Sequence, residues 1–93
     1  MSIYPDHLII QHHPEEGRFK IDLGDAQAVL DYRVEGDKIY FLHTGVPPEY
    51  EGQGIGSRLA RAGLDFARQN GYKIVALCSF VDGYLRRHPE YLA

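Results

Sequence analysis

The sequence is short of the residues and patterns that mark several classes of protein. It has one cysteine, Cys78, so an internal disulfide is excluded. Lys and Arg number 10 against 13 Asp and Glu, which gives a formal net charge of −3. A general nucleic-acid binder usually carries a basic excess instead, so no nucleic-acid partner is expected. Any anion site must therefore be local and built from a few groups.

Long apolar runs are also lacking. No stretch approaches the roughly 20 residues that a membrane helix needs, and residues 1–7 do not show the basic-then-apolar pattern of a signal peptide. The 93 residues are 44% hydrophobic, which is ordinary for a globular protein and too high for a disordered one. We expect one domain over residues 1–93, in a cytoplasmic monomer with no membrane partner.

The first half of the chain has the patterns of β-strands. Phe19, Ile21 and Leu23 alternate with polar residues, as in a half-buried strand. Similar segments are separated by turn residues rich in Gly, Pro and Asp. The predicted strands are residues 7–13, 18–23, 26–34 and 38–46. Joined by short turns, they form an antiparallel meander.

The pattern changes at Pro47 and Pro48, which cannot donate to a strand ladder. Residues 53–70 have helical periodicity, and Asn70-Gly71 is a good helix stop. Residues 73–78 form a nearly continuous apolar run, which suits a strand covered on both faces. Residues 79–87 form a second helix that ends before Pro89. The predicted fold is α+β, in the order β-β-β-β-α-β-α, with a mostly antiparallel sheet and one parallel pair between 38–46 and 73–78.

The segment between the last meander strand and the first helix contains Gly54 and Gly56. The first amides of a helix lack intrahelical acceptors and carry partial positive charge, so they can bind an anion such as phosphate. No Lys-Ser/Thr pair follows as in a P-loop, and the antiparallel strands do not fit a dinucleotide fold. From spacing alone, a phosphate site and a glycine turn that only permits close packing remain open.

Residues 46–59, Val-Pro-Pro-Glu-Tyr-Glu-Gly-Gln-Gly-Ile-Gly-Ser-Arg-Leu, resemble the acetyl-CoA signature of the GNAT superfamily of N-acetyltransferases, Arg/Gln-x-x-Gly-x-Gly/Ala. More narrowly, the chain resembles the small single-domain NATD-like or YjdJ-like group. This narrower match includes His43-Thr44-x-Val46, Cys78-Ser79-Phe80 and His88-Pro89-Glu90-Tyr91. One position departs from the signature: Glu51 stands where Arg or Gln is usual.

The resemblance implies a minimal GNAT-like fold and a placement for the cofactor. Pyrophosphate would lie on the helix-start amides, the pantetheine arm along the end of the fourth strand, and the thioester near Cys78. The cofactor-binding residues so implied are Thr44, Val46, Gln53, Gly54, Ile55, Gly56, Ser57 and Arg58.

Three residues are candidates for the chemistry. Cys78, at a predicted helix start that lowers a thiol pKa, is an acyl acceptor, a proton shuttle, a wall of the thioester pocket or an inert buried thiol. His43 suits a general base near neutral pH, and the resemblance makes Tyr84 an acid for the leaving thiolate. A structural role is the alternative for His43 and for Tyr84.

The pairs His12-His13 and Glu15-Glu16 flank a turn without convergent metal-ligand spacing, so a solvated loop and no metal are predicted. The resulting hypothesis is an acetyl-CoA-dependent N-acetyltransferase that acts on an amine, either a small molecule or a protein lysine. A non-catalytic acyl-CoA-binding module and a small interaction domain are the alternatives.

Overall fold

The computed structural model describes residues 8–92. Within this range the predicted order of strands and helices is confirmed, and a 3-10 turn follows both the fourth strand and the second helix. The predicted first strand began at His7, which lies outside the described residues. The elements are β1 (Ile10–His13), β2 (Arg18–Asp22), β3 (Gln27–Glu35), β4 (Lys38–Gly45), η2 (Pro48–Tyr50), α1 (Ile55–Gln69), β5 (Lys73–Ala76), α2 (Ser79–Arg87) and η3 (Pro89–Leu92).

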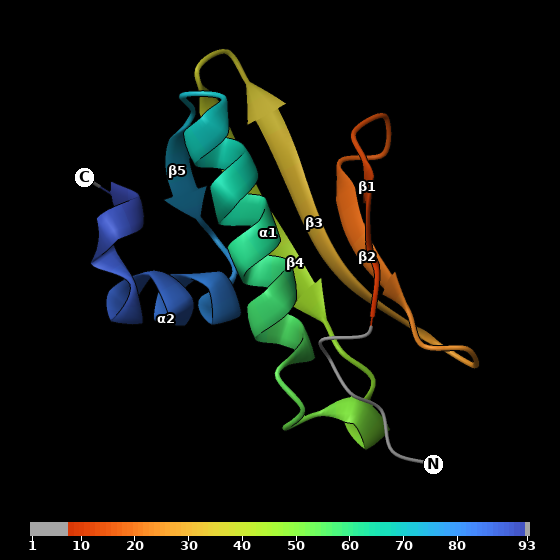
Figure 1. Cartoon of the computed structure of the whole chain (residues 1–93). Helices are drawn as coiled ribbons and strands as arrows, with labels where there is room; N and C mark the ends of the chain where they lie inside the picture. Colours follow the sequence, from red (N-terminus) through yellow and green to blue (C-terminus); the bar gives the residue numbers. More distant parts are fainter. Residues whose placement is uncertain (1–7, 93) are drawn as a thin grey trace.

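The strands form one sheet in the order β1-β2-β3-β4-β5. The first four are antiparallel neighbours, and β5 pairs parallel to β4 as far as Phe41 and Ala76. The predicted α+β fold with a parallel β4/β5 pair is therefore confirmed. Figure 1 shows α1 lying along the strands, with α2 beside β5.

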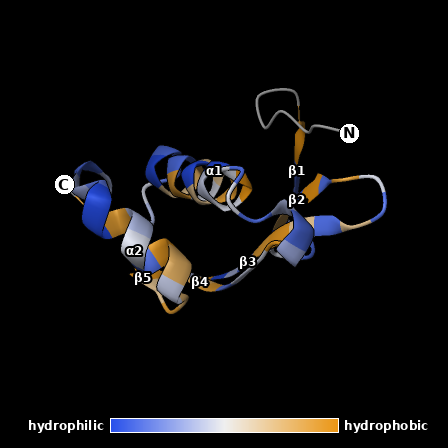
Figure 2. Cartoon of the chain, turned by 90° about the horizontal axis from the view of Figure 1, so that it is seen from below, coloured by the Kyte–Doolittle hydropathy of each residue, from blue (hydrophilic) through white to orange (hydrophobic). Residues whose placement is uncertain are grey.

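The core lies between the sheet and α1. The predicted inward face of β2 is buried, with Phe19 4% and Ile21 0% exposed, whereas Val34, expected on the inward face of β3, is 38% exposed near the end of that strand. Gly63 brings α1 close to the sheet, because a Cβ there would be 2.7 Å from Leu30 Cδ2 and 2.8 Å from Phe41 Cε1. Figure 2 shows the sheet curving beneath α1. No helix within residues 8–92 has the length and apolar character needed to span a bilayer.

A β-bulge in β4 decides which side chains face α1. Tyr32 pairs with Phe41 and Asp31 with His43, which leaves Leu42 as the extra residue. Beyond the bulge Thr44 pairs with the buried Leu30. His43 lies on the opposite face, because a Cβ at its neighbour Gly45 would be 3.1 Å from His43 Nε2 and 3.5 Å from Val29 Cγ2.

The expectation that the last strand is covered on both faces was wrong. β5 is the edge of the sheet, its residues are at most half-buried, and the adjoining Leu77 is 64% exposed. The apolar run indicated a central strand, whereas its covering comes from α1 and α2 on one side only. The run of apolar residues alone does not report how many layers cover a strand.

Candidate functional site

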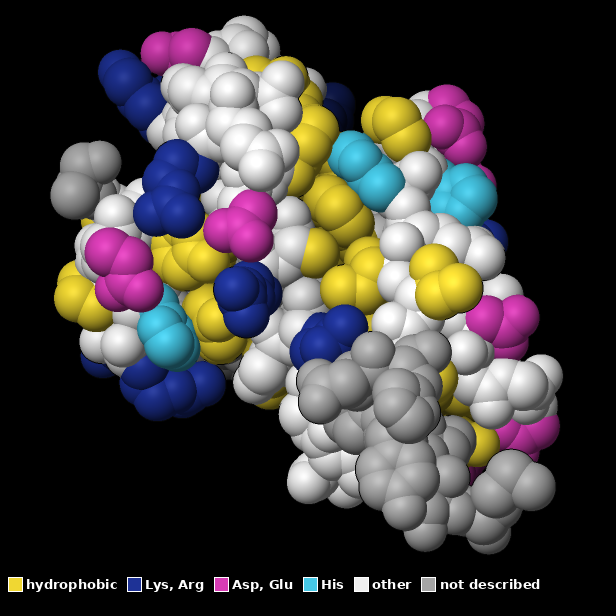
Figure 3. All heavy atoms as spheres, in the orientation of Figure 1, with side chains coloured by type: hydrophobic (Ala, Val, Ile, Leu, Met, Phe, Trp, Pro, Cys, Tyr) yellow, Lys and Arg dark blue, Asp and Glu magenta, His cyan; other side chains and the backbone are white. Residues whose placement is uncertain are grey.

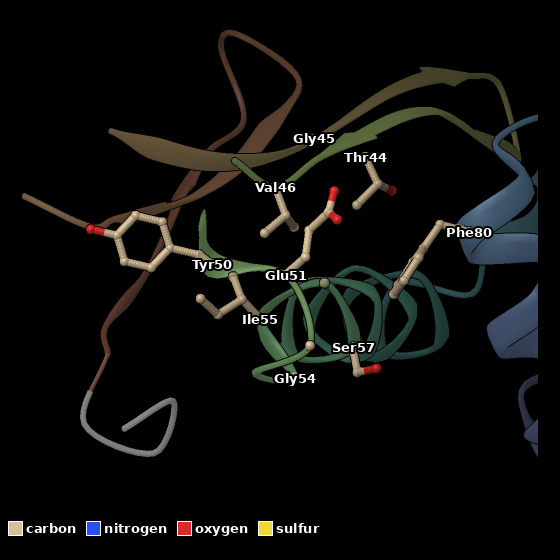
Figure 4. A pocket seen from close by; sticks show the side chains of 11 residues that line it. Thr44, Gly45, Val46, Tyr50, Glu51, Gly54, Ile55, Ser57 and Phe80 are labelled. Carbon is tan, nitrogen blue, oxygen red and sulfur yellow. The ribbon is translucent and has the colours of Figure 1, made fainter. Parts of the chain in front are cut away.

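A cavity of about 480 Å³ lies where the N-terminus of α1 faces the end of β4. We call it the amide cavity. Figure 4 shows side chains from β4, the following loop, α1 and α2 around it. It is lined by Thr44, Gly45, Val46, Tyr50, Glu51, Gly52, Gly54, Ile55, Gly56, Ser57 and Phe80.

The backbone at the start of α1 leaves its amides available to a ligand. Gly54 is the N-cap residue, with φ 79°, and no side chain caps the helix there. The amide of Arg58 makes the first helical bond, to the Gly54 carbonyl at 3.1 Å. The three amides before it, from Ile55 to Ser57, have no intrahelical acceptor and lie at the positive end of the helix dipole. This arrangement is suited to an anion with several oxygens, such as a phosphate.

The loop before α1 is held by Tyr50 at the end of the short helix η2. Its hydroxyl donates to Asp25 Oδ1 at 2.9 Å and lies 3.3 Å from the Leu23 carbonyl oxygen. These bonds tie the loop to the turn between β2 and β3. The site thus has a fixed wall on the side away from α2.

Beside the cavity, β4 runs past the end of its partner β5. The ladder between them stops at Phe41 and Ala76. The amides of Leu77 and Cys78 both donate to the Phe41 carbonyl, at 2.9 and 3.1 Å, and the chain then turns into α2. The rest of β4, from Leu42 to Gly45, has no β5 residue opposite it in the described sheet. Its backbone edge is available to hydrogen-bond an extended ligand.

Cys78 lies at this divergence and is 9% exposed. Its Sγ is 3.2 Å from Thr44 Oγ1. Burial alone would raise the pKa of the Cys78 thiol, but hydrogen bonding from Thr44 and from the backbone amides of Val81 and Phe80 outweighs it, so the pKa lies below its ordinary value. Cys78 is also the N-cap residue of α2, although it makes no formal capping bond. The site therefore favours a thiolate more than a buried cysteine normally does.

The structure brings together most of the residues predicted to bind a cofactor. Six of the eight line the amide cavity: Thr44, Val46, Gly54, Ile55, Gly56 and Ser57. The other two, Gln53 and Arg58, are not among the lining residues. Arg58 instead borders a smaller hollow of about 240 Å³ with Ile10, Arg61, Ala62 and Asp65.

The predicted acid and base do not line the amide cavity, and neither does Cys78, which lies behind Thr44. His43 is exposed on the opposite face of the sheet, beyond the bulge. Tyr84 is 8% exposed and stacks on His88 with ring centroids 4.2 Å apart, while the Arg87 guanidinium lies 5.9 Å from its ring centroid. Neither residue lines the amide cavity.

Two features of the cavity were not predicted. Phe80 in the first turn of α2 forms one wall. Glu51, where the family signature usually has Arg or Gln, also lines the cavity, and in Figure 4 its carboxylate points into the space toward Thr44. No Lys or Arg is among the described residues that line the cavity. Positive potential there comes from the helix amides and is opposed by Glu51.

The other end of α1 has a different character. His12, Phe19, Tyr32, Phe66 and Tyr72 form what we call the aromatic cluster, with neighbouring ring centroids 4.0 to 5.9 Å apart. His12 Nε2 and the Tyr32 hydroxyl are 2.6 Å apart. In Figure 3 hydrophobic side chains run between α1 and the β1–β2 hairpin, with histidine and acidic side chains on the hairpin side.

The hairpin turn does gather three potential metal ligands, contrary to the expectation of no convergence. One atom each from His13, Glu15 and Glu16 lies within 4.8 Å of the others. Both carboxylates are exposed, and they lie 3.4 and 3.7 Å from His13 Nδ1. The turn Pro14–Gly17, closed by the Gly17 amide bond to the Pro14 carbonyl, explains this proximity.

Fold and cavity together define a class of protein: a small α+β domain with uncapped amides at a helix start, beside the open edge of a diverging parallel strand pair, as in acetyltransferases. Comparison with known families agrees with this class. The family model described as GCN5-related N-acetyl-transferase matches residues 18–93. The chain belongs to this family and to its small NATD-like group.

Individual relatives support the assignment. The chain is 34% identical to Protein NATD1 of Mus musculus over 83 residues, which is 86% of this chain and 76% of the relative. It is 33% identical to Protein NATD1 of Danio rerio over 90 residues, or 91% and 82% of the two chains. It is also similar to the NMR structure of a GCN5-like protein from Staphylococcus aureus, with 39% identity, a TM-score of 0.71 and coverage of 90% and 83%. Family membership supports acetyltransferase activity in general.

Proposed function

We propose that the amide cavity binds acetyl-CoA and that the protein transfers the acetyl group from it to an amine. The observation that carries this proposal is the continuity of the site. The uncapped amides at the start of α1 and the unpaired edge of β4 at Thr44 line one cavity, and Thr44 Oγ1 lies 3.2 Å from Cys78 Sγ behind it. A phosphate-bearing thioester with an extended amide arm has the chemistry that matches these three parts in order.

Each part has a defined task. The amides of Ile55, Gly56 and Ser57 would hold phosphate oxygens, and Gly54 adds no side chain beside them. The edge of β4 at Thr44, and Val46 just after the strand, would pair with the amides of the pantetheine arm. Gln53 and Arg58, outside the cavity lining, have a lesser part.

Acetyl-CoA supplies an activated carbonyl with a thiolate leaving group. The acceptor amine must reach it neutral, lose a proton as the new C–N bond forms, and the C–S bond must break. Cys78, with its lowered pKa, can accept that proton while the CoA thiolate leaves. Alternatively, the Cys78 thiolate attacks the acetyl carbonyl, the C–S bond to CoA breaks and CoA thiolate leaves; the amine then attacks the S-acetyl thioester, and Cys78 leaves as a thiolate that takes up the amine proton. Thr44 Oγ1 is placed to donate to the Cys78 thiolate. His43 lies on the opposite face of the sheet, away from the amide cavity.

Thermal unfolding with and without acetyl-CoA tests the binding step. Ligand at about 100 times its Kd should add about 2.7 kcal/mol to the free energy of unfolding. A folded protein that saturating acetyl-CoA does not stabilise would contradict the proposal. Release of free thiol with a panel of small amines and a lysine peptide then tests transfer.

Variants of Cys78 test its part in the chemistry. Cys78→Ala should lower turnover by about 10²- to 10⁴-fold if the thiol transfers a proton or the acetyl group. Cys78→Ser, which keeps a polar group near Thr44, distinguishes the thiol from its hydrogen bond. Mass spectrometry of protein mixed with acetyl-CoA would detect an adduct at Cys78, and near-normal turnover of Cys78→Ala would make the residue a packing group.

A non-catalytic acyl-CoA-binding module is the second candidate. It is favoured by the burial of Tyr84 against His88 and by the exposure of His43 away from the amide cavity. The module would be stabilised by acetyl-CoA but would release no thiol above the hydrolysis rate with any amine. The same two measurements, stabilisation by acetyl-CoA and thiol release with amines, therefore distinguish the enzyme from the binding module.

A further inference from the structure

Phe80 lies in the first turn of α2 and packs against the first turn of α1. A Cβ built on Gly56 would be 2.7 Å from Phe80 Cζ and 3.2 Å from both neighbouring ring carbons. The ring therefore contacts the helix start directly. Phe80 is nevertheless 39% exposed, and it lines the amide cavity. One surface of the Phe80 ring thus packs against Gly56, while another surface is exposed to the cavity.

Phe80 lies between the helix-start amides, where phosphate would bind, and Cys78. Cys78 does not line the cavity as it stands. Thr44 and Phe80 do, and Thr44 Oγ1 is 3.2 Å from Cys78 Sγ. In Figure 4 Thr44 lies above the cavity and the Phe80 ring closes the side toward α2. A ligand that extends from the amides toward Cys78 must pass between these two side chains.

The two sides of this passage differ in chemistry. The β4 side offers backbone hydrogen-bonding groups with no β5 partner, whereas the α2 side offers an aromatic ring. A pantetheine arm alternates amides with methylene and dimethyl groups, so it needs a polar edge and an apolar wall together. We propose that Phe80 is the positioning residue that supplies the apolar wall for the pantetheine arm and directs the thioester toward Cys78. The inference rests on the proposed function.

The test compares a ligand that has the arm with one that lacks it. Binding of acetyl-CoA and of its nucleotide half, 3′-phospho-ADP, is measured by calorimetry for the wild type, Phe80→Ala and Phe80→Leu. Phe80→Ala should weaken acetyl-CoA binding about tenfold, because the apolar contact with the arm is lost. Its affinity for 3′-phospho-ADP should stay within about twofold of wild type. Phe80→Leu keeps an apolar wall and should therefore retain most of the acetyl-CoA affinity. If Phe80→Ala does not fold, the Phe80→Leu variant still tests the inference.

The outcomes separate this inference from the function on which it rests. If both ligands bind the wild type and Phe80→Ala weakens both equally, the residue only supports the helix start and the inference is overturned. It is also overturned if the variant binds both ligands like wild type. If neither ligand binds the folded wild type, the proposed function itself fails, and the role of Phe80 falls with it.

Discussion

The two ends of α1 are built in opposite ways. At the N-terminal end, helix amides and an unpaired strand edge surround the amide cavity. At the C-terminal end, the aromatic cluster packs closely, and two of its polar atoms, His12 Nε2 and the Tyr32 hydroxyl, lie 2.6 Å apart. The difference teaches that one helix can have a proposed binding site at one end and closely packed side chains that stabilise the fold at the other.

The largest expected effect concerns the aromatic cluster. Phe19 is 4% exposed and stacks on His12 with ring centroids 4.0 Å apart. Phe19→Ala should lower the free energy of unfolding by about 3–5 kcal/mol, because it leaves a cavity in packed rings. Urea denaturation measures this loss. Phe19→Leu should lose less and remain folded enough for binding, and a large change in its affinity for acetyl-CoA would show that the two ends are not independent.

The second prediction uses two matched glycines, one at each end of α1. Gly54 has φ 79° and Gly71 has φ 70°, and a Cβ on either would meet nothing within 4 Å. Gly54→Ala and Gly71→Ala should each destabilise the fold by about 1–2 kcal/mol, because the left-handed backbone conformation disfavours a side chain. Only Gly54→Ala should also weaken acetyl-CoA binding, since Gly54 lines the amide cavity. Equal affinities for the two variants would contradict a phosphate site at this end.

A smaller effect should appear as a pH dependence of stability. Burial lowers the pKa of His12 from its ordinary 6.5, although Glu15 partly offsets this. The unfolded chain therefore takes up a proton at a higher pH than the folded chain, so stability is complete above pH 6.5 and falls as the pH drops below it. Melting temperatures between about pH 7.5 and 5.5 measure the slope. His12→Gln should flatten that slope, and an unchanged slope would assign it to other groups.

The smallest effect is expected at Glu51, whose carboxylate points into the amide cavity. Glu51→Gln should strengthen acetyl-CoA binding by roughly two- to fivefold at low salt, because an exposed like charge near phosphate is removed. Stability should not change. Glu49→Gln is the matched control, since Glu49 is exposed in the same loop but does not line the cavity. A gain in affinity for both variants alike would mark a long-range charge effect.

Local patterns predicted the fold well because its elements are short and regular. The alternation of Phe19 and Ile21 needs no knowledge of other strands, and both residues are buried. The bulge at Leu42 is different, since it exists only in the pairing of β4 with β3. It places Thr44, rather than His43, with the residues that face α1, and no feature of residues 38–46 alone indicates the shift.

The candidate site also has parts that local sequence patterns predict and parts that depend on tertiary packing. The amides at Gly54 to Ser57 follow from glycines placed before a helical pattern, which is local information. The contact of Phe80 with Gly56 depends on how α2 packs, which sequence periodicity does not give. Helical spacing puts Arg58 and Arg61 on the polar face of the helix, and in the structure both border the smaller hollow instead of the amide cavity. The roles of Cys78, His43 and Tyr84 stay predictions.

The unpaired end of β4 has a consequence for the protein in concentrated solution. A free strand edge is a template on which another chain can add a strand, and this is a common start of aggregation. The edge here spans only Leu42 to Gly45, and the bulge at Leu42 twists it away from a flat geometry. A molecule that paired with this edge would cover the exposed backbone. Ligand-free protein should therefore self-associate more readily than ligand-bound protein, and the short, bulged edge limits that tendency.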